Sequence, residues 1–297
     1  MPSIARYRRL THRGTRRGRT VIGLAVLIAL GVLWWWTGSQ RPAVPMLPLL
    51  AFVALCELAA LGGMLLVRRS VHLASLEAHK ESAGFVYATL GSAYAVLLSF
   101  MVVVGWTQYR DAEDTMTKEA ITVATLFHLA DGLAEPTQRE LQQTLVEYNR
   151  TVLDEEWAAM DHGEESERAW SLSDKLWDIY MRAPAADQAQ SAYQQSLSQV
   201  QQLYALRGQR LLSSHSALPS SIWAVLVAGA IVTVAFTYLF GVHSVIAQGV
   251  MTAALTAIIA GSLYLIFDLE TPYSGPLHLK PTPYLTNQAF FDTRLPQ

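Results

Sequence analysis

Five long apolar stretches alternate with polar segments along the chain. Each stretch approaches or exceeds the ~20 residues that an α-helix needs to cross ~30 Å of hydrocarbon. Soluble domains rarely contain even one such stretch. The pattern therefore predicts a polytopic membrane protein with five transmembrane helices, at residues 21–37, 44–67, 84–106, 221–242 and 246–267.

The polar insert at 107–220 separates the third predicted span from the fourth, and its apolar residues recur at helical spacing in four segments. The first segment continues the third span without a break. The second begins at Thr137, with Glu140 as the partner of a capping box. The third begins at Ser171, and the fourth covers about 187–214. Short connections favour antiparallel neighbours, so we predict an all-α fold with an antiparallel helical bundle standing on the membrane.

Charge is distributed unevenly along the chain and predicts its orientation. Residues 1–20 contain seven arginines and no acidic residue, whereas the insert 107–220 contains 18 Asp or Glu against 9 Lys or Arg. The positive-inside rule places the basic start and the loop 68–83 in the cytoplasm. The insert and the tail 268–297 then lie outside a bacterial inner membrane. Trp106 and Trp223 fall at the outer interface in this arrangement, as membrane tryptophans often do.

The same pattern divides the chain into six segments. We read the arginine cluster as a topology signal rather than a nucleic-acid site. A cleaved signal peptide is the alternative for 21–37, but Thr37-Gly38-Ser39 is a weak match to a cleavage site, so a retained signal anchor is favoured. The segments are a cytoplasmic N-terminus (1–20), the signal anchor (21–37), two spans with a cytoplasmic loop (44–106), the acidic bundle (107–220), a transmembrane hairpin (221–267) and an extracytoplasmic tail (268–297).

Glu57 is the ionisable residue in the middle of a predicted span. A charged group at that depth costs at least ~2.5 kcal/mol on insertion scales, which makes it a functional-site candidate. The alternative is a protonated carboxyl group that hydrogen-bonds to a neighbouring helix. The sequence leaves both interpretations open.

One ion pair follows from helix geometry. Glu119 lies thirteen residues past Trp106, or ~20 Å along a continuous helix. Arg207 and Arg210 precede Trp223 by sixteen and thirteen residues, so they should reach a similar height. We predict that Glu119 pairs with one of these arginines and ties two stalk helices together.

Motifs of catalysis and of metal binding do not stand out in the sequence. It contains no phosphate-binding glycine loop, nucleophile elbow or zinc motif, and the single cysteine, Cys56, lies within the second predicted span. We therefore expect a membrane protein without enzymatic activity and without a cofactor.

The order of several local patterns resembles the bestrophin-like family of bacterial membrane proteins, long catalogued as a domain of unknown function. The resemblance covers about 46–285 and leaves the first span as an addition. Its distinctive last pattern is Asp268-x-Glu270-x-Pro272-Tyr273-x-Gly275. The others are Glu57-x-x-x-x-Gly62 with Arg68-Arg69, Leu97-Leu98-Ser99-Phe100 leading through Tyr109 and Ala112 to Glu119-Ala120, Tyr148 with Glu156-Trp157, Arg207-x-x-Arg210-Leu211, and Leu218-Pro219-x-x-Ile222-Trp223.

This resemblance implies a channel-like assembly. True bestrophins are pentameric anion channels in which a Leu-Gly-Phe segment contributes to the pore neck, and Leu98-Ser99-Phe100 is similar. It implies that the third span lines a path with Ser92, Val96, Ser99 and Phe100. Asp268 and Glu270 would stand at the outer mouth and attract cations, or would act in capping and turn formation around Pro272 and Gly275. Bestrophins keep their helical domain in the cytoplasm, whereas the charge bias here places it outside.

Two functions are consistent with these features of the chain. The first is a bestrophin-like homo-oligomer in the lipid bilayer that passes ions. The alternative is a non-conducting membrane protein whose extracytoplasmic bundle binds a protein partner or senses envelope conditions. Ion flux and oligomeric state distinguish the two functions, because a central pore of the bestrophin kind requires several subunits.

Overall fold

The computed structural model describes residues 46–70, 80–188, 191–215, 218–240, 242 and 244–294. The chain divides into Met1–Met46 and Leu47–Gln297, and the second unit is described below. The basic segment 1–20 and the first predicted span lie outside the described residues. No strand occurs among the residues that are described, in agreement with the predicted all-α fold.

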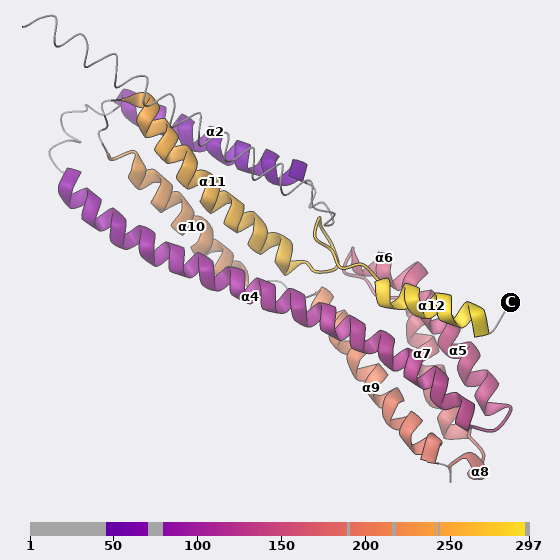
Figure 1. Cartoon of the computed structure of the whole chain (residues 1–297). Coiled ribbons are helices and arrows are strands. Elements are labelled where there is room, and N and C mark those ends of the chain that lie inside the picture. Colours follow the sequence, from indigo (N-terminus) through magenta and orange to yellow (C-terminus); the bar gives the residue numbers. More distant parts are fainter. Residues whose placement is uncertain are drawn as a thin grey trace, which may run out of the picture. The chain divides into compact units, whose positions relative to one another are not determined.

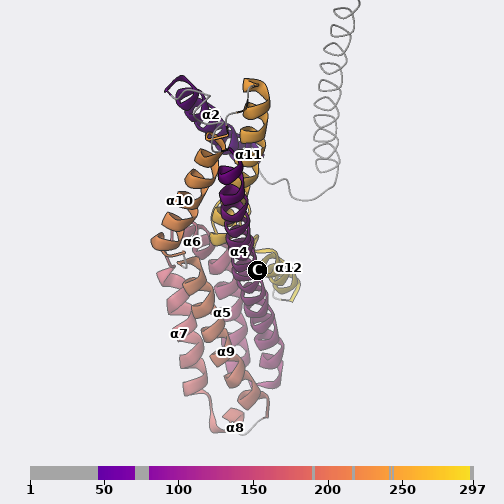
Figure 2. The same ribbon diagram turned by 90° about the vertical axis from the view of Figure 1, so that its left-hand side faces the viewer.

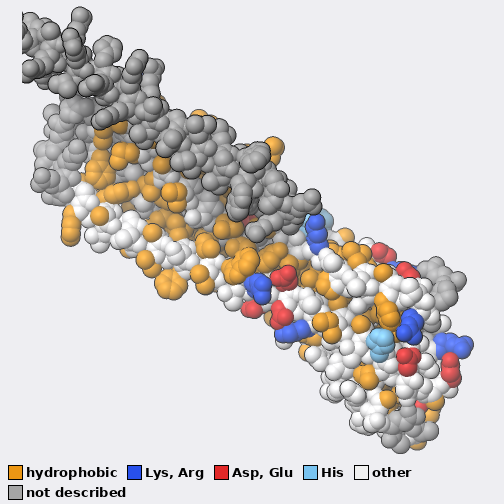
Figure 3. Space-filling model, viewed as in Figure 1, with side chains coloured by type: hydrophobic (Ala, Val, Ile, Leu, Met, Phe, Trp, Pro, Cys, Tyr) orange, Lys and Arg blue, Asp and Glu red, His pale blue; other side chains and the backbone are white. Residues whose placement is uncertain are grey.

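Among the residues that the structure describes, four helices are long and apolar enough to cross a membrane. They are α2 (Met46–Ser70), α4 (Lys80–Leu129), α10 (Ser220–Thr237) and α11 (Val245–Glu270), and they cover the second to fifth predicted spans. Figure 3 shows hydrophobic side chains over this region, whereas the charged side chains lie mainly over the other end of the molecule, on the helices of the insert. This segregation is expected of a protein that hydrocarbon solvates at one end and water at the other.

Helix α4 joins the membrane part to the bundle. Its 50 residues extend ~75 Å at 1.5 Å per residue. Figure 1 shows α4 beside α10 and α11 along its first half and beside α9 (Ser191–Ser214) along its second half. The predicted continuation of the third span into the insert is therefore present as one unbroken helix.

One buried stripe follows α4 through both environments. Its members succeed one another at intervals of three, four or seven residues, which is the spacing of a single helix face. They are Tyr94, Leu98, Met101, Gly105, Ala112, Met116, Glu119, Val123 and Leu126.

The bundle consists of α4, α9 and the elements between them, which lie side by side in Figure 2. These elements are η1 (Ala130–Gly132), α5 (Thr137–Thr151), the π-helix η2 (Val152–Glu156), α6 (Trp157–Met160), α7 (Glu167–Arg182) and α8 (Ala185–Gln188). The core is contiguous and includes Val123, Leu145, Tyr148, Leu176 and Val200.

One predicted helix start and one predicted capping residue in the bundle were wrong. Helix α7 begins at Glu167 rather than at Ser171, because the Ser166 side chain accepts a hydrogen bond from the Ala169 amide and caps the helix. Helix α5 begins at Thr137, as predicted, but Thr137 does not form the capping box, since its hydroxyl donates instead to Asp187 Oδ2 at 2.9 Å. The start of α7 and the role of Thr137 both depend on side-chain hydrogen bonds, which the spacing of apolar residues does not reveal.

The tail contains a helix that the spacing pattern did not predict. Helix α12 (Thr282–Arg294) packs on the bundle, with Tyr284 and Phe291 fully buried. The Phe291 ring lies 4.7 Å from that of Phe127, measured between centroids. The side chain of Asn149 donates to the Tyr284 carbonyl oxygen at 3.0 Å. The predicted boundary at residue 220 therefore does not end the bundle, because α12 completes its core.

Truncation of Phe291 should destabilise the bundle. Phe291→Ala leaves a cavity among aromatic side chains, so the free energy of unfolding should fall by about 3–5 kcal/mol. Leu285→Ala on the same helix is the control, because Leu285 is 54% exposed and its loss should change stability by about 0.5 kcal/mol or less. Circular dichroism during denaturation in mild detergent measures both. Equal effects of the two substitutions would contradict the buried position of α12.

Candidate functional site

The four side chains expected to line a path all lie on the exposed side of α4. Val96 is 55% exposed and Phe100 is 66% exposed in the subunit. Ser92 and Ser99 are exposed as well, and their hydroxyls donate to backbone carbonyl oxygens of α4 at 2.9 Å. Since both hydroxyls form hydrogen bonds within α4, the exposed side of this helix requires no polar partner from another helix of the subunit.

The opposite side of α4 is anchored to the hairpin. The Tyr94 hydroxyl donates to the Leu226 carbonyl oxygen at 2.8 Å, and its ring occupies the space that a side chain at position 229 would need. A Cβ at Gly105 would lie 3.2 Å from Leu269, so α4 and α11 approach closely there. These contacts determine which face of α4 points away from the subunit.

The predicted stalk ion pair is present and fully buried. Arg210 Nε lies 2.7 Å from Glu119 Oε2, and its Nη2 lies 3.1 Å from Oε1. Tyr148 adds a 2.6 Å hydrogen bond to Glu119 Oε1. Burial and the Glu119 carboxylate raise the pKa of Tyr148 well above its usual range, so its hydroxyl remains a donor.

Glu156 extends this pair into a network that helix spacing alone did not predict. Its Oε1 accepts hydrogen bonds from Arg207 at 3.1 and 3.2 Å and lies 3.5 Å from Arg210 Nη2. The Arg207 guanidinium also lies 4.2 Å from the centre of the Trp170 ring. Burial tends to lower the pKa of Arg210, but the facing carboxylates outweigh it and raise the pKa well above its usual value. Arg210 is therefore charged.

The turn after α11 uses both of its carboxylates internally. Asp268 is 1% exposed, and its Oδ1 accepts a hydrogen bond from the Leu277 amide at 3.4 Å. Glu270 is 6% exposed and accepts hydrogen bonds from Trp223 Nε1 at 2.9 Å and from the Leu218 amide. Neither carboxylate faces solvent as a free charge in the subunit, so these contacts favour capping and turn formation, one of the two roles expected from the sequence.

Pro272 and Gly275 shape the same turn. The Pro272 carbonyl oxygen accepts a hydrogen bond from the Leu279 amide at 2.7 Å. Gly275 has a φ of 79°, which glycine adopts without strain. The turn thereby brings the chain from the end of α11 to the start of α12.

Glu57 lies on α2 and is half-buried. No hydrogen bond or ion pair joins its carboxyl group to another residue in the described ranges. The structure thus places it on a membrane helix apart from the network of the bundle.

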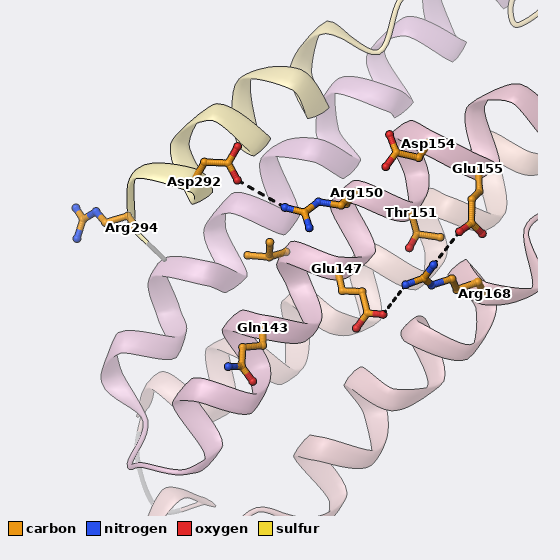
Figure 4. A pocket seen from close by; sticks show the side chains of 10 residues that line it. Gln143, Glu147, Arg150, Thr151, Asp154, Glu155, Arg168, Asp292 and Arg294 are labelled. Carbon is orange, nitrogen blue, oxygen red and sulfur yellow. Dashed lines mark hydrogen bonds and ion pairs between the residues drawn. The ribbon is translucent and has the colours of Figure 1, made fainter. Parts of the chain in front are cut away.

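A charged basin of about 580 Å³ opens on the bundle surface. Figure 4 shows Arg168 between Glu147 and Glu155, at 2.9 and 3.0 Å, and Arg150 directed toward Asp292 at 3.8 Å. All five side chains are roughly half exposed, so solvent screens these pairs and they add little to the stability of the bundle. In the described part of the chain, no group of three or more His, Cys, Asp or Glu is arranged to hold a metal ion.

The comparisons with known proteins decide the family. The model of the bestrophin-like domain matches residues 53–284, well over half of the chain. The chain belongs to the bestrophin-like family. No curated protein matches the sequence.

Solved structures of bacterial bestrophin homologues share the fold. A point mutant of the homologue from Klebsiella pneumoniae has a TM-score of 0.65 at 13% identity, covering 82% of this chain and 99% of its own. Another structure of a bestrophin homologue from the same organism has a TM-score of 0.62 at 13% identity, with coverages of 81% and 97%. A structure described only as a membrane protein gives 0.64 at 13% identity, with 82% and 99%.

The patterns that carry the resemblance to the bestrophin-like family meet in space. Glu119, Tyr148 and Glu156 lie far apart in the sequence from Arg207 and Arg210, yet all five form one buried network. The patterns around Trp223 and Glu270 meet in the same way through a hydrogen bond. The buried network and the hydrogen bond between Trp223 and Glu270 thus stabilise the bestrophin-like fold at two different levels along α4.

Removal of one charge from the network should destabilise the protein strongly. Glu119→Gln leaves Arg210 buried with Glu156, 3.5 Å away, as its one remaining carboxylate partner among the described residues, so the free energy of unfolding should fall by about 3–5 kcal/mol. Glu119→Gln combined with Arg210→Gln should lose less than the sum of the two single losses.

The matched control is Asp114→Asn, which removes the exposed pair between Asp114 and Lys118 on the same helix. This change should alter the free energy of unfolding by at most about 1 kcal/mol. Denaturation in mild detergent measures every variant. A Glu119→Gln variant as stable as Asp114→Asn would refute the role of the buried pair.

Proposed function

We propose that this chain forms a homo-oligomer in the lipid bilayer in which α4 of each copy lines an ion path. The observation that carries the proposal is the exposed stripe of α4, with Ser92, Val96, Ser99 and Phe100 pointing away from the subunit. Family membership supports it, since the resemblance to bestrophins implies a channel built from several subunits. Phe100 and Val96 would form an apolar constriction, which can restrict ions by dewetting.

The proposed orientation follows the charge bias. The end of α2 carries Arg68 and Arg69, and its membrane boundary would lie in the cytoplasm with the N-terminus. The acidic bundle would then lie outside the inner membrane. The network of Glu119 and Arg210 would brace the path-lining helix from that side.

In this proposal, Arg110 of α4 supplies the charge that ions would meet next to the path. It is exposed, lies two heptads beyond Val96 on α4, and forms no ion pair with another described residue. The next turn carries Asp114, which is paired with Lys118 at 2.5 Å. One Arg110 from each copy would form a ring of positive charge, and such rings favour anions. With Asp268 and Glu270 buried, we propose anion preference in place of cation attraction.

The alternative is a non-conducting protein whose bundle binds a partner. The charged basin around Arg150 and Arg168 is the observation that favours it, because paired and half-exposed charges suit a polar protein contact. A monomer without ion flux is the result that would select this function.

Reconstituted protein should pass ions, and Phe100→Ala should increase the flux. Loss of the Phe100 phenyl group widens the apolar constriction and makes it easier for water to fill it. A fluorescence assay of ion flux into liposomes measures the effect. Leu58→Ala on α2 is the control and should leave flux unchanged, because Leu58 is 71% exposed on a helix outside the path. If a confirmed oligomer gives no more flux than empty vesicles, the proposal is refuted.

Charge at position 110 should determine ion preference. Arg110→Glu should shift the reversal potential in a salt gradient toward cations, because it inverts the sign of the ring. Lys118→Gln, which removes a positive charge about two turns farther out, is the control and should shift it less. Planar bilayer recordings measure both. An unchanged reversal potential in Arg110→Glu would exclude Arg110 from the path.

A further inference from the structure

A groove of about 360 Å³ lies between α2 and the hairpin of α10 and α11. Its walls are mostly apolar, and the side chains that α2 contributes are small. They are Cys56, Ala59 and Ala60 on α2, opposite both small and larger side chains of the hairpin such as Ala230, Ala260 and Ile259. Small side chains on membrane helices usually permit close packing. Here they face one another across open space.

Helix α2 contacts the hairpin toward both ends of the groove, and these contacts hold the groove open between them. Toward one end of α2, the rings of Phe52 and Tyr264 lie 5.9 Å apart. Beyond Ala60, the Tyr238 hydroxyl donates to the Ala60 carbonyl oxygen at 2.8 Å. A Cβ at position 63 would lie 3.0 Å from that hydroxyl, so Gly63 admits the Tyr238 ring as a wedge. The helices are thus held in contact without closing over the space between them.

The wall of the groove contains one buried polar atom without a partner. The Thr256 side chain is 4% exposed and lines the groove, and its hydroxyl forms no hydrogen bond in the described part of the chain.

Two cations stand beyond the Tyr238 end of the groove. Arg68 Nη1 donates to the Val242 carbonyl oxygen at 2.9 Å and to Gln248 Oε1 at 2.5 Å, which leaves its Nε and Nη2 without an acceptor among the described residues. Arg69 is exposed and forms no ion pair there. Arg68 follows Ala60 by eight residues, or ~12 Å along the helix. This separation suits a headgroup at the arginines and a hydrocarbon chain beside Ala60.

We propose that the groove binds an anionic phospholipid, with an acyl chain along Ala59 and Cys56 and the phosphate at Arg69 and the free edge of Arg68. Hydrocarbon is the solvent of this part of the protein, so it fills an open apolar groove between membrane helices. Guanidinium groups bind phosphate through charge-assisted hydrogen bonds, and basic positions at the membrane boundary select anionic lipids. The bound lipid would complete the packing of α2. This site is independent of ion conduction.

Native mass spectrometry of the full chain in mild detergent tests the headgroup. Palmitoyl-oleoyl phosphatidylglycerol should bind more tightly than the matching phosphatidylcholine. Arg69→Gln should weaken phosphatidylglycerol binding about fivefold, the loss expected for one cation at a membrane surface. Arg139→Gln removes an exposed charge in the bundle and should leave lipid binding unchanged. Equal affinity for the two lipids, unaffected by Arg69→Gln, would overturn the proposal.

Photocrosslinking in vesicles tests the acyl chain. Phosphatidylglycerol with a diazirine in its acyl chain should label the groove residues more than Leu55 and Leu58, which are exposed on α2 and do not line the groove. The groove residues to compare are Cys56, Ala59, Ala60, Ala230, Ile231, Val234 and Ala235. Ala59→Leu should fill the groove and reduce this labelling, whereas Ala54→Leu on the opposite side of α2 should not. Even labelling of all exposed apolar faces would overturn the proposal. So would crosslinks from a second copy, or from residues before 46, that occupy the groove in place of lipid.

Discussion

The buried contact between Glu119 and Arg210 constrains the whole subunit, because Glu119 belongs to the same unbroken helix as the exposed stripe in the membrane. A helix fixed in rotation at one height is fixed at every other height. The hydrogen bond from Tyr94 to the Leu226 carbonyl oxygen secures the same helix within the bilayer. The direction in which Ser99 and Phe100 point is therefore set by polar contacts that lie outside that face. Both contacts are shielded from water, where hydrogen bonds and ion pairs are hardest to exchange.

A second connection between membrane and bundle runs through the end of the chain. Glu270 joins the end of α11 to the start of α10 through Trp223, and the turn at Gly275 then leads to α12. Helix α12 buries Tyr284 and Phe291 in the bundle core and donates from Asn287 to the Ala120 carbonyl oxygen of α4 at 2.7 Å. The hairpin and the bundle are thus tied together by α4 and by α12. If the hairpin tilted relative to the bundle, buried hydrogen bonds would break.

The sequence predicted the features that depend on length and rise along a helix. Four described spans, the continuity of α4 and the height match of Glu119 with Arg210 all follow from such counting. Glu156 escaped prediction because it ends a run of three acidic residues in a π-helix, and spacing does not reveal which of them is buried. Helix α12 escaped because its buried side is mostly Tyr284 and Phe291, seven residues apart, with amides between them. The burial of Asp268 and Glu270 depends on partners up to 52 residues away, which no local pattern contains.

These constraints limit how a path along α4 could open and close. Rotation of α4 would expose Glu119 and separate it from Arg210, so the helix is not a suitable moving part. Side-chain rotation of Phe100 breaks no hydrogen bond, since the ring is exposed and Ser99 is satisfied within the helix. Helix α2 is different, because the contacts on either side of its groove are few and local stability follows contact density. Movement within the subunit is therefore expected first at the Phe100 ring and at α2, while α4 and the bundle move as one body.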